Sequence, residues 1–319
     1  MSLTTTVSEG VADYHVPTAG KPCKTWYKVF GDLSHPGHER PLVVVHGGPG
    51  SCHNYLLPIS KLWDTHHIPV VLYDQIGNGN STHLPEKKGD VSFWTEVLFR
   101  DELENLLRHL KINNDYDLLG QSWGGMLSAA FATYQPKGLK RLIITNSPAS
   151  MDLWVESSNK LRLTLPEEVQ AVLDEHEEAG TTDSEAYEEA TQVFYKRHLC
   201  RVDPWPEELA KSFEIMGQDS TVYLTMNGPN EFYITGSLKT WSIIDDLHKV
   251  KVPTLVINGR YDGAQDEAVF PFFNNIPKCR WVRFEGSSHL PQFEEPERFF
   301  ELIGDFLTHA RVEEEYGSV

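Results

Sequence analysis

Residues 116–125 of the chain are Tyr-Asp-Leu-Leu-Gly-Gln-Ser-Trp-Gly-Gly, and this stretch decides the fold. Its apolar first four residues predict a buried strand, and residues 125–134 have the pattern of a helix. Between the two stands a G-x-S-x-G pentapeptide, whose small residues flank a sharp turn. Such a turn strains the backbone at the serine and presents its hydroxyl above the sheet, beside a helix N-terminus that favours negative charge. We therefore predict that Ser122 is a nucleophile.

Other apolar runs repeat this pattern on both sides of the stretch. Each is followed by a turn rich in glycine or aspartate, and helix-length patterns such as residues 93–110 stand between them. The runs are Leu42 to Val45, Pro69 to Tyr73, Leu142 to Thr145 and Thr254 to Ile257. Short continuous apolar runs are typical of parallel strands that are buried on both faces, and their alternation with helices predicts a doubly wound, mostly parallel α/β sheet.

The alternation of strand-like and helical segments stops in the middle of the chain, where the sequence has a helical pattern rich in acidic and aromatic residues. Strand-like sequence resumes at Val-Pro-Thr-Leu-Val-Ile-Asn-Gly-Arg-Tyr-Asp, residues 252–262. We expect one core domain made of residues 1–148 and 241–319, with residues 149–240 inserted as a helical cap, or lid. The alternative is a solvated helical face with no gating role. The terminal residues 311–319 are expected to be frayed.

A second glycine-rich turn, His46-Gly47-Gly48-Pro49-Gly50, follows another apolar run. Glycines there let backbone amides come close to a substrate. An amide from this loop, that of Gly48, paired with the amide of Trp123 would form an oxyanion hole for a tetrahedral intermediate. Taken alone, the motif would be interpreted as an ordinary Gly-Pro turn.

A serine nucleophile needs a base, and the base needs an orienting carboxylate. Asp262 stands where the carboxyl end of a strand would put it, and His289 lies in a glycine turn after the strand-like Cys-Arg-Trp-Val-Arg-Phe, residues 279–284. Asp266 is the rival acid, but it lies past the turn and at the start of the next helical pattern. We predict that Ser122, His289 and Asp262 form the catalytic set.

The composition excludes several kinds of partner. Lys and Arg total 28 against 46 Asp and Glu, which gives a net charge of −18 and a surface that repels nucleic acid and anionic membranes. No window approaches the roughly 20 apolar residues of a membrane span, and the first residues lack the pattern of a secretory signal. We expect a cytoplasmic protein that binds a small molecule or short peptide, and we predict no metal and no cofactor.

Four segments together resemble the prolyl aminopeptidases, also called proline iminopeptidases, a family of the α/β-hydrolase fold that is similar to the tricorn-interacting aminopeptidase and to L-amino-acid amide hydrolases. They are HGGPG at 46–50, YDQIGNGNS at 73–81, GQSWGG at 120–125 and MNGPNEF at 226–232. The resemblance implies a serine hydrolase that forms an acyl-enzyme and cleaves a small amide, either an N-terminal residue or an amino-acid amide. It also implies that Glu231 binds the free amine of the substrate, for which a carboxylate is chemically suited.

The chain departs from this pattern at one position. Relatives that resemble the tricorn-interacting enzyme carry a second amine-binding glutamate directly after the catalytic aspartate, whereas this chain has Gly263 after Asp262. Two alternatives therefore stay open: a carboxylesterase or lactonase of secondary metabolism, which would share every catalytic part, and a receptor that keeps the fold and the triad to bind a ligand.

Overall fold

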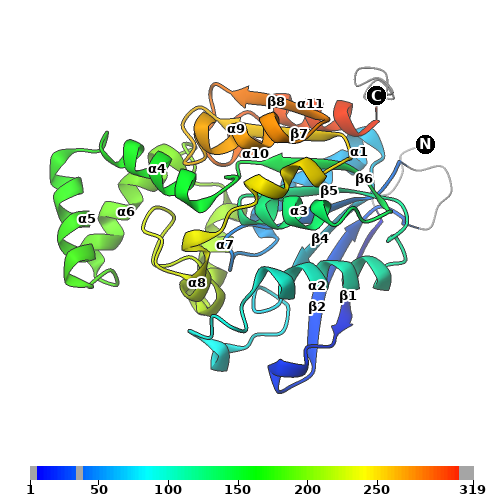
Figure 1. Ribbon diagram of the computed structural model, residues 1–319, viewed down its shortest axis with the longest axis horizontal. Helices are drawn as coiled ribbons and strands as arrows, with labels where there is room; N and C mark the ends of the chain where they lie inside the picture. The colour runs from blue at the N-terminus through cyan, green and yellow to red at the C-terminus, as the bar shows by residue number, and fades with distance from the viewer. Residues whose placement is uncertain (1–5, 34–38, 309–319) are drawn as a thin grey trace.

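The protein, described here by a computed structural model over residues 6–33 and 39–308, is built on an eight-stranded sheet with the order β1-β2-β4-β3-β5-β6-β7-β8 (Figure 1). The pairs β1-β2 and β2-β4 are antiparallel and the others are parallel. The strands are β1 (Val7–Tyr14), β2 (Cys23–Phe30), β3 (Leu42–Val45), β4 (Val70–Asp74), β5 (Tyr116–Gln121), β6 (Leu139–Thr145), β7 (Thr254–Gly259) and β8 (Cys279–Phe284). The expectation of fraying at residues 311–319 concerns residues outside the described ranges.

The apolar runs of the sequence become the parallel centre of this sheet, which confirms the predicted fold class. Strands β3, β4 and β5 are buried throughout, as the continuous apolar runs predict. Strands β1 and β2 were not among the predicted strands. They form an antiparallel hairpin at the sheet edge, and the exposed and buried positions mixed within β1 give it no continuous apolar run.

Helices cover both faces of the sheet. Side chains of consecutive residues in β3 pack into the apolar clusters on opposite faces. Val43 and Val45 belong to the apolar cluster that includes α2, α3 and α9, whereas Leu42 and Val44 belong to the one that includes α1 and α11. These helices and the short ones beside them are η1 (Pro17–Ala19), η2 (Asn54–Ser60), α1 (Lys61–His66), η3 (Pro85–Lys87), α2 (Glu96–His109), α3 (Trp123–Thr133), η5 (Ile244–Lys249), α9 (Asp266–Asn275), α10 (Pro291–Glu294) and α11 (Pro296–Thr308).

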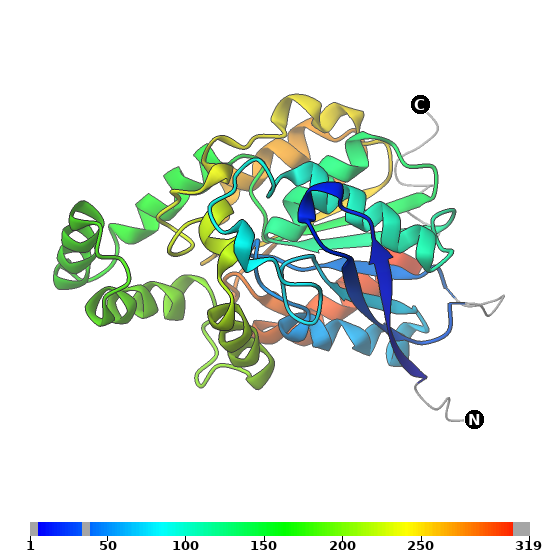
Figure 2. The same ribbon diagram turned by 90° about the horizontal axis from the view of Figure 1, so that it is seen from below.

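The remaining helices lie between β6 and β7 and extend away from the sheet (Figures 1 and 2). They are α4 (Met151–Arg162), α5 (Glu167–Ala179), α6 (Glu185–His198), α7 (Glu207–Gln218), α8 (Thr221–Met226) and η4 (Ser237–Thr240). Helices α5 and α6 form an apolar cluster of their own. An antiparallel bridge between Ser150 and Ser242 brings the two ends of this segment together. Within the described part of the chain, no helix has both the length and the apolarity needed to cross a membrane.

Candidate active site

Ser122 occupies the turn between β5 and α3, at φ 56° and ψ −125°. A positive φ is rare for a residue with a side chain, and it persists only where the surroundings hold it in place. Packing around the turn explains the flanking glycines. A side chain on Gly120 would collide with the carbonyl of Gly124, and one on Gly124 would collide with the carbonyl of Val45. Helix α3 begins at the next residue, so the serine lies at a helix N-terminus.

His289 and Asp262 form a buried pair. The distance from His289 Nδ1 to Asp262 Oδ1 is 2.6 Å, and the amide of Ala264 and the side-chain amide of Asn146 also donate to the carboxylate of Asp262. Burial alone would lower the pKa of His289, but the charge and hydrogen bond of Asp262 outweigh it and raise that pKa above its usual value. The carboxylate therefore favours the imidazolium that a general base must become.

The rival acid lies elsewhere. Asp266 is the first residue of α9, and its half-exposed carboxylate pairs with Arg283 at 2.6 Å and accepts a hydrogen bond from Asn258 at 3.1 Å. Its ion pair with Arg283 faces solvent. The carboxylate that touches the imidazole is that of Asp262.

Two cavities meet at Ser122. The larger, a space of about 420 Å³ that is partly open to solvent, is lined by Ser122, Gly48, Glu231 and His289, with apolar side chains from Leu199, Leu209, Phe213 and Met216. The smaller, about 260 Å³ including space open to solvent, shares Ser122, Gly48 and Glu231 and is otherwise lined by Trp123, Met126, Pro148, Met151, Trp154, Asn227 and Leu238. The predicted nucleophile, base and amine-binding carboxylate thus face the same larger cavity.

The glycine loop after β3 reaches this cavity through Gly48, whose φ is 111°. A side chain at Gly48 would collide with the amide nitrogen of Gly50, so only glycine fits. The neighbouring amide of Gly47 already donates to the hydroxyl of Tyr55 at 2.7 Å. On the other side, Trp123 is the first residue of α3, a position whose amide has no acceptor within the helix. Gly48 and Trp123 therefore both border Ser122 in the cavities that meet there.

Sequence reasoning missed a hydrogen-bonded bridge beneath the serine. The hydroxyl of Tyr55, which accepts from Gly47, donates to Gln121 Oε1 at 2.6 Å, and Gln121 Nε2 donates to the carbonyl of His289 at 3.2 Å. Burial raises the pKa of Tyr55, so the phenol stays protonated and can donate. The bridge ties the glycine loop to the loop that carries the base. Gln121 was visible as the second residue of the pentapeptide, but nothing in the sequence identified Tyr55.

A second network explains two of the other motifs. The amide of Gln75 donates to His46 Nε2 at 3.0 Å, while the side chain of Gln75 donates to the His46 carbonyl at 2.9 Å and accepts from the indole of Trp123 at 2.9 Å. Burial lowers the pKa of His46 to about 4, so its ring is neutral at pH 7 and can accept at Nε2. His46 and Gln75 therefore position the glycine loop against α3 and do no proton transfer.

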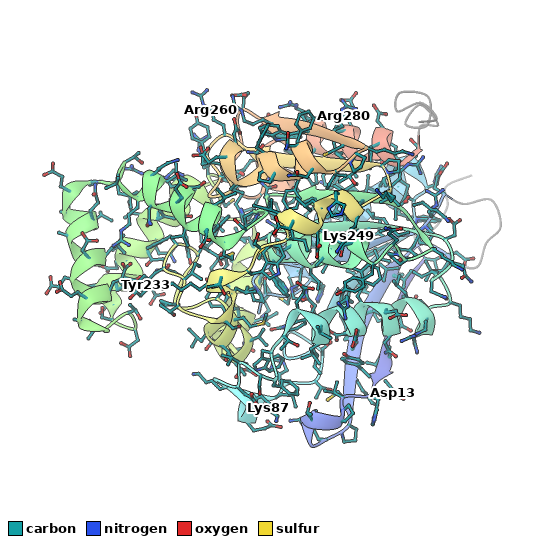
Figure 3. All side chains as sticks on the ribbon, in the orientation of Figure 1. Asp13, Lys87, Tyr233, Lys249, Arg260 and Arg280 are labelled. Carbon is teal, nitrogen blue, oxygen red and sulfur yellow. The ribbon has the colours of Figure 1, made fainter. Side chains whose placement is uncertain are left out.

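Glu231 lies in the irregular segment after α8, which returns toward the core near Tyr233 (Figure 3). Its Oε1 accepts from the hydroxyl of Tyr223 at 2.8 Å, its amide donates to the hydroxyl of Tyr195 at 3.3 Å, and its carbonyl accepts from the indole of Trp154 at 2.6 Å. Burial raises the pKa of this carboxyl, although the neighbouring His289 and the hydrogen bond from Tyr223 oppose the shift. An ammonium group placed beside it would offset the cost of burying the charge.

Among residues 6–33 and 39–308, no group of three or more His, Cys, Asp or Glu side chains is arranged to hold a metal ion. Ser122 and His289 line one cavity, and Asp262 contacts the imidazole of His289. A serine, a histidine and an aspartate are the residue types that acyl transfer through a serine uses.

Comparison with known proteins agrees with this chemistry. A family model described as alpha/beta hydrolase fold matches residues 40–296. A proline iminopeptidase from Saccharolobus solfataricus is 36% identical over 271 residues, which cover 85% of this chain and 86% of that protein.

Two solved structures are similar over nearly the whole chain. The crystal structure of VinJ has a TM-score of 0.88 and 49% identity, covering 93% of this chain and 98% of that one. The proline iminopeptidase of Mycobacterium smegmatis has a TM-score of 0.84 and 46% identity, covering 94% and 97%. The chain therefore belongs to the proline iminopeptidase family of the α/β-hydrolase fold.

Proposed function

We propose that this protein is a serine hydrolase that removes an N-terminal residue of the proline type from a short peptide, or releases the acid from an amino-acid amide. The single observation that carries the proposal is the larger cavity, where Ser122, His289 and Glu231 line one space. The nucleophile and its base supply the cleavage, and the carboxylate supplies a reason to prefer a free amine. The names of the relatives support the same activity and favour it over an esterase or lactonase.

The reaction follows from the roles that the geometry supports. His289 takes the proton of the Ser122 hydroxyl as its oxygen attacks the scissile carbonyl, and Asp262 stabilises the resulting imidazolium through the 2.6 Å hydrogen bond. The imidazolium then gives this proton to the leaving amine as the C–N bond breaks. Water, deprotonated by the same histidine, attacks the acyl-enzyme and releases the acid and the free serine.

The negative charge of each tetrahedral intermediate needs donors that are already in place. The amides of Gly48 and Trp123 are our proposed pair, since Gly48 lines both cavities and the amide of Trp123 opens α3. The hydrogen bond from Gly47 to Tyr55 fixes the glycine loop, and the one from the Trp123 indole to Gln75 fixes the start of α3.

Glu231 is proposed to bind the substrate amine. Its carboxylate retains only one hydrogen-bond donor among the described contacts, the hydroxyl of Tyr223, which leaves capacity for an ammonium. A capped nitrogen could not offer the charge, so the carboxylate would disfavour it. The enzyme would thus act at the free N-terminus of a peptide and not at internal peptide bonds.

Residues 149–240 are proposed to act as a cap over the site. Leu199, Leu209, Phe213 and Met216 lie in this segment, yet they line the larger cavity together with Ser122. They present an apolar surface to the cavity that His289 also lines, where the leaving group must accept its proton. The cap therefore forms part of the substrate-binding surface.

A panel of chromogenic substrates tests the proposal. The central quantity is the amine ratio, which we define as kcat/KM for prolyl p-nitroanilide divided by kcat/KM for cyclopentanecarbonyl p-nitroanilide, a molecule of the same shape with a CH₂ group in place of the ring nitrogen. We expect a ratio well above ten, as a charge-assisted hydrogen bond provides. A ratio near one together with rapid hydrolysis of p-nitrophenyl esters would establish an esterase instead. No labelling of Ser122 by a fluorophosphonate, with substrate recovered intact, would establish a receptor.

A further inference from the structure

Trp154 connects the inserted segment with the candidate active site. It lies in the first turn of α4, which begins after the Ser150–Ser242 bridge, and its side chain is buried. The indole N–H donates to the backbone carbonyl of Glu231 at 2.6 Å. A hydrogen bond to the main chain fixes the position of the residue without consuming its carboxylate, so the charge of Glu231 stays available to a ligand.

The absence of a side chain at Gly263 leaves room for the indole of Trp154. A β-carbon on Gly263 would lie 2.8 Å from Cη2 of Trp154 and 3.2 Å from Cζ2 and Cζ3, closer than carbon atoms pack. The backbone itself does not require glycine there, because Gly263 is absent from the residues with positive φ. The space for the indole is therefore the feature that glycine provides at this position.

The indole ring also borders the reacting groups. Its centroid lies 5.7 Å from that of the His289 ring, at an interplanar angle of 63°. It lines the smaller cavity together with Ser122 and Glu231. With the amine at Glu231 and the carbonyl at Ser122, the side chain of the substrate's first residue would enter this smaller cavity, because His289, which must pass its proton to the leaving group, lines the larger cavity and not the smaller one.

We infer that Trp154 is a positioning and specificity residue: its N–H holds the main chain of Glu231 in place in the cavity that Glu231 shares with Ser122, and its ring limits the size of the first residue of the substrate. The inference rests on the proposed function and adds to it a residue that positions the amine-binding carboxylate and limits the size of the first residue. Gly263 is the partner that makes the arrangement possible. Trp154 does no chemistry itself.

The first test is Trp154→Phe, which keeps an aromatic ring and removes the N–H donor. We expect the amine ratio to fall about three- to tenfold, the effect of one hydrogen bond on the placement of the carboxylate. The matched control is Trp205→Phe, since the indole of Trp205 donates to the carbonyl of Cys200 at 3.2 Å and lines neither cavity at Ser122. The control should leave the amine ratio unchanged. An unchanged ratio in Trp154→Phe would overturn the positioning role.

The second test is Trp154→Ala, which enlarges the smaller cavity. We expect kcat/KM for phenylalanyl p-nitroanilide, relative to that for prolyl p-nitroanilide, to rise by roughly tenfold or more as the larger ring is admitted. An unchanged relative value would overturn the ring as a limit on size.

Gly263→Ala keeps every other side chain of the site and pushes against the indole, so it tests the inference in the wild-type background even if the Trp154 variants fail to fold; an unchanged amine ratio there would overturn the inference. It should lower the amine ratio in the wild-type background, and in the Trp154→Ala background it should change the ratio less than twofold, because the clash is gone. Equal effects in both backgrounds would overturn the pairing of the two residues. Wild-type enzyme with an amine ratio near one would refute the proposed function instead, which the same assay shows before any variant is made.

Discussion

Replacing Glu231 by glutamine removes one charge and little else. The two side chains have the same shape, and the carbonyl oxygen of a glutamine can still accept the hydrogen bond that Tyr223 donates at 2.8 Å. The backbone contacts with Trp154 and Tyr195 involve the main chain of residue 231 and stay available. Glu231→Gln therefore isolates the charge of the carboxylate from its position.

The size of the effect follows from the bond that is lost. A hydrogen bond to a charged group contributes roughly 1.5–3 kcal/mol, and about 1.36 kcal/mol corresponds to a factor of ten in rate. We expect kcat/KM for prolyl p-nitroanilide to fall about ten- to a hundredfold, and the amine ratio to fall by a similar factor. A neutral substrate such as cyclopentanecarbonyl p-nitroanilide has no ammonium with which to use the charge.

The same variant should move the pH profile in a direction that the electrostatics fix. The negative charge of Glu231 contributes to raising the pKa of His289, after the larger effects of burial, which lowers it, and of Asp262, which raises it. Without that charge the imidazolium is less favoured and the pKa of His289 falls. Because the base works in its neutral form, the acid limb of kcat/KM for p-nitrophenyl acetate should shift to lower pH in Glu231→Gln.

The assay compares wild type, Glu231→Gln and the control Glu301→Gln, which changes an exposed carboxylate on α11. Kinetics on the two p-nitroanilides give the amine ratio, and the ester gives the pH profile. Equal losses on both p-nitroanilides would reduce Glu231 to a structural residue. An acid limb that moved to higher pH would contradict the charge coupling between Glu231 and His289.

Three further predictions concern the catalytic machinery. Ser122→Ala should lower kcat by about 10⁴-fold or more with an unchanged thermal melt, and retained turnover would disprove the nucleophile. Asp262→Asn should lower kcat far more than Asp266→Asn, since only Asp262 contacts the imidazole, and steady-state kinetics showing the reverse order would exchange the two acids. Tyr55→Phe removes the hydroxyl that joins the glycine loop to Gln121, so kcat should fall about ten- to a hundredfold with KM little changed; a change confined to KM would place Tyr55 in substrate binding.

Local sequence patterns anticipated the parts of the molecule that depend on local backbone geometry. The strand, turn and helix around Ser122 follow from an apolar run, small residues and a helical pattern within about 20 residues of one another. The loop at His46 to Gly50 was recognisable for the same reason. Both motifs concern where a backbone must turn sharply or approach a ligand closely, and only a few residue types allow this.

The supporting contacts could not be predicted in this way, because they join residues that only the tertiary fold brings together. Tyr55 and Gln121 are 66 positions apart, and Trp154 and Glu231 are 77 apart. An aromatic residue in a helical pattern has many possible partners, and burial alone does not distinguish them. The hairpin of β1 and β2 was missed for a related reason, since it lies at the sheet edge and its pattern lacks a continuous apolar run.

At Gly263, the residue after Asp262, the sequence pattern and the tertiary contacts bear on the same question. From the sequence, Gly263 is a missing carboxylate when the chain is set beside the enzymes it resembles. In the structure, the indole of Trp154 lies where the side chain of residue 263 would begin, 2.8 Å from an added β-carbon. A glutamate at 263 and the present position of this indole exclude each other sterically. A second carboxylate beside Asp262 would also make it harder to keep both ionised. In the proposed site the free amine therefore depends on Glu231 alone, and the space that a second carboxylate would need is occupied by the indole that hydrogen-bonds to the main chain of Glu231.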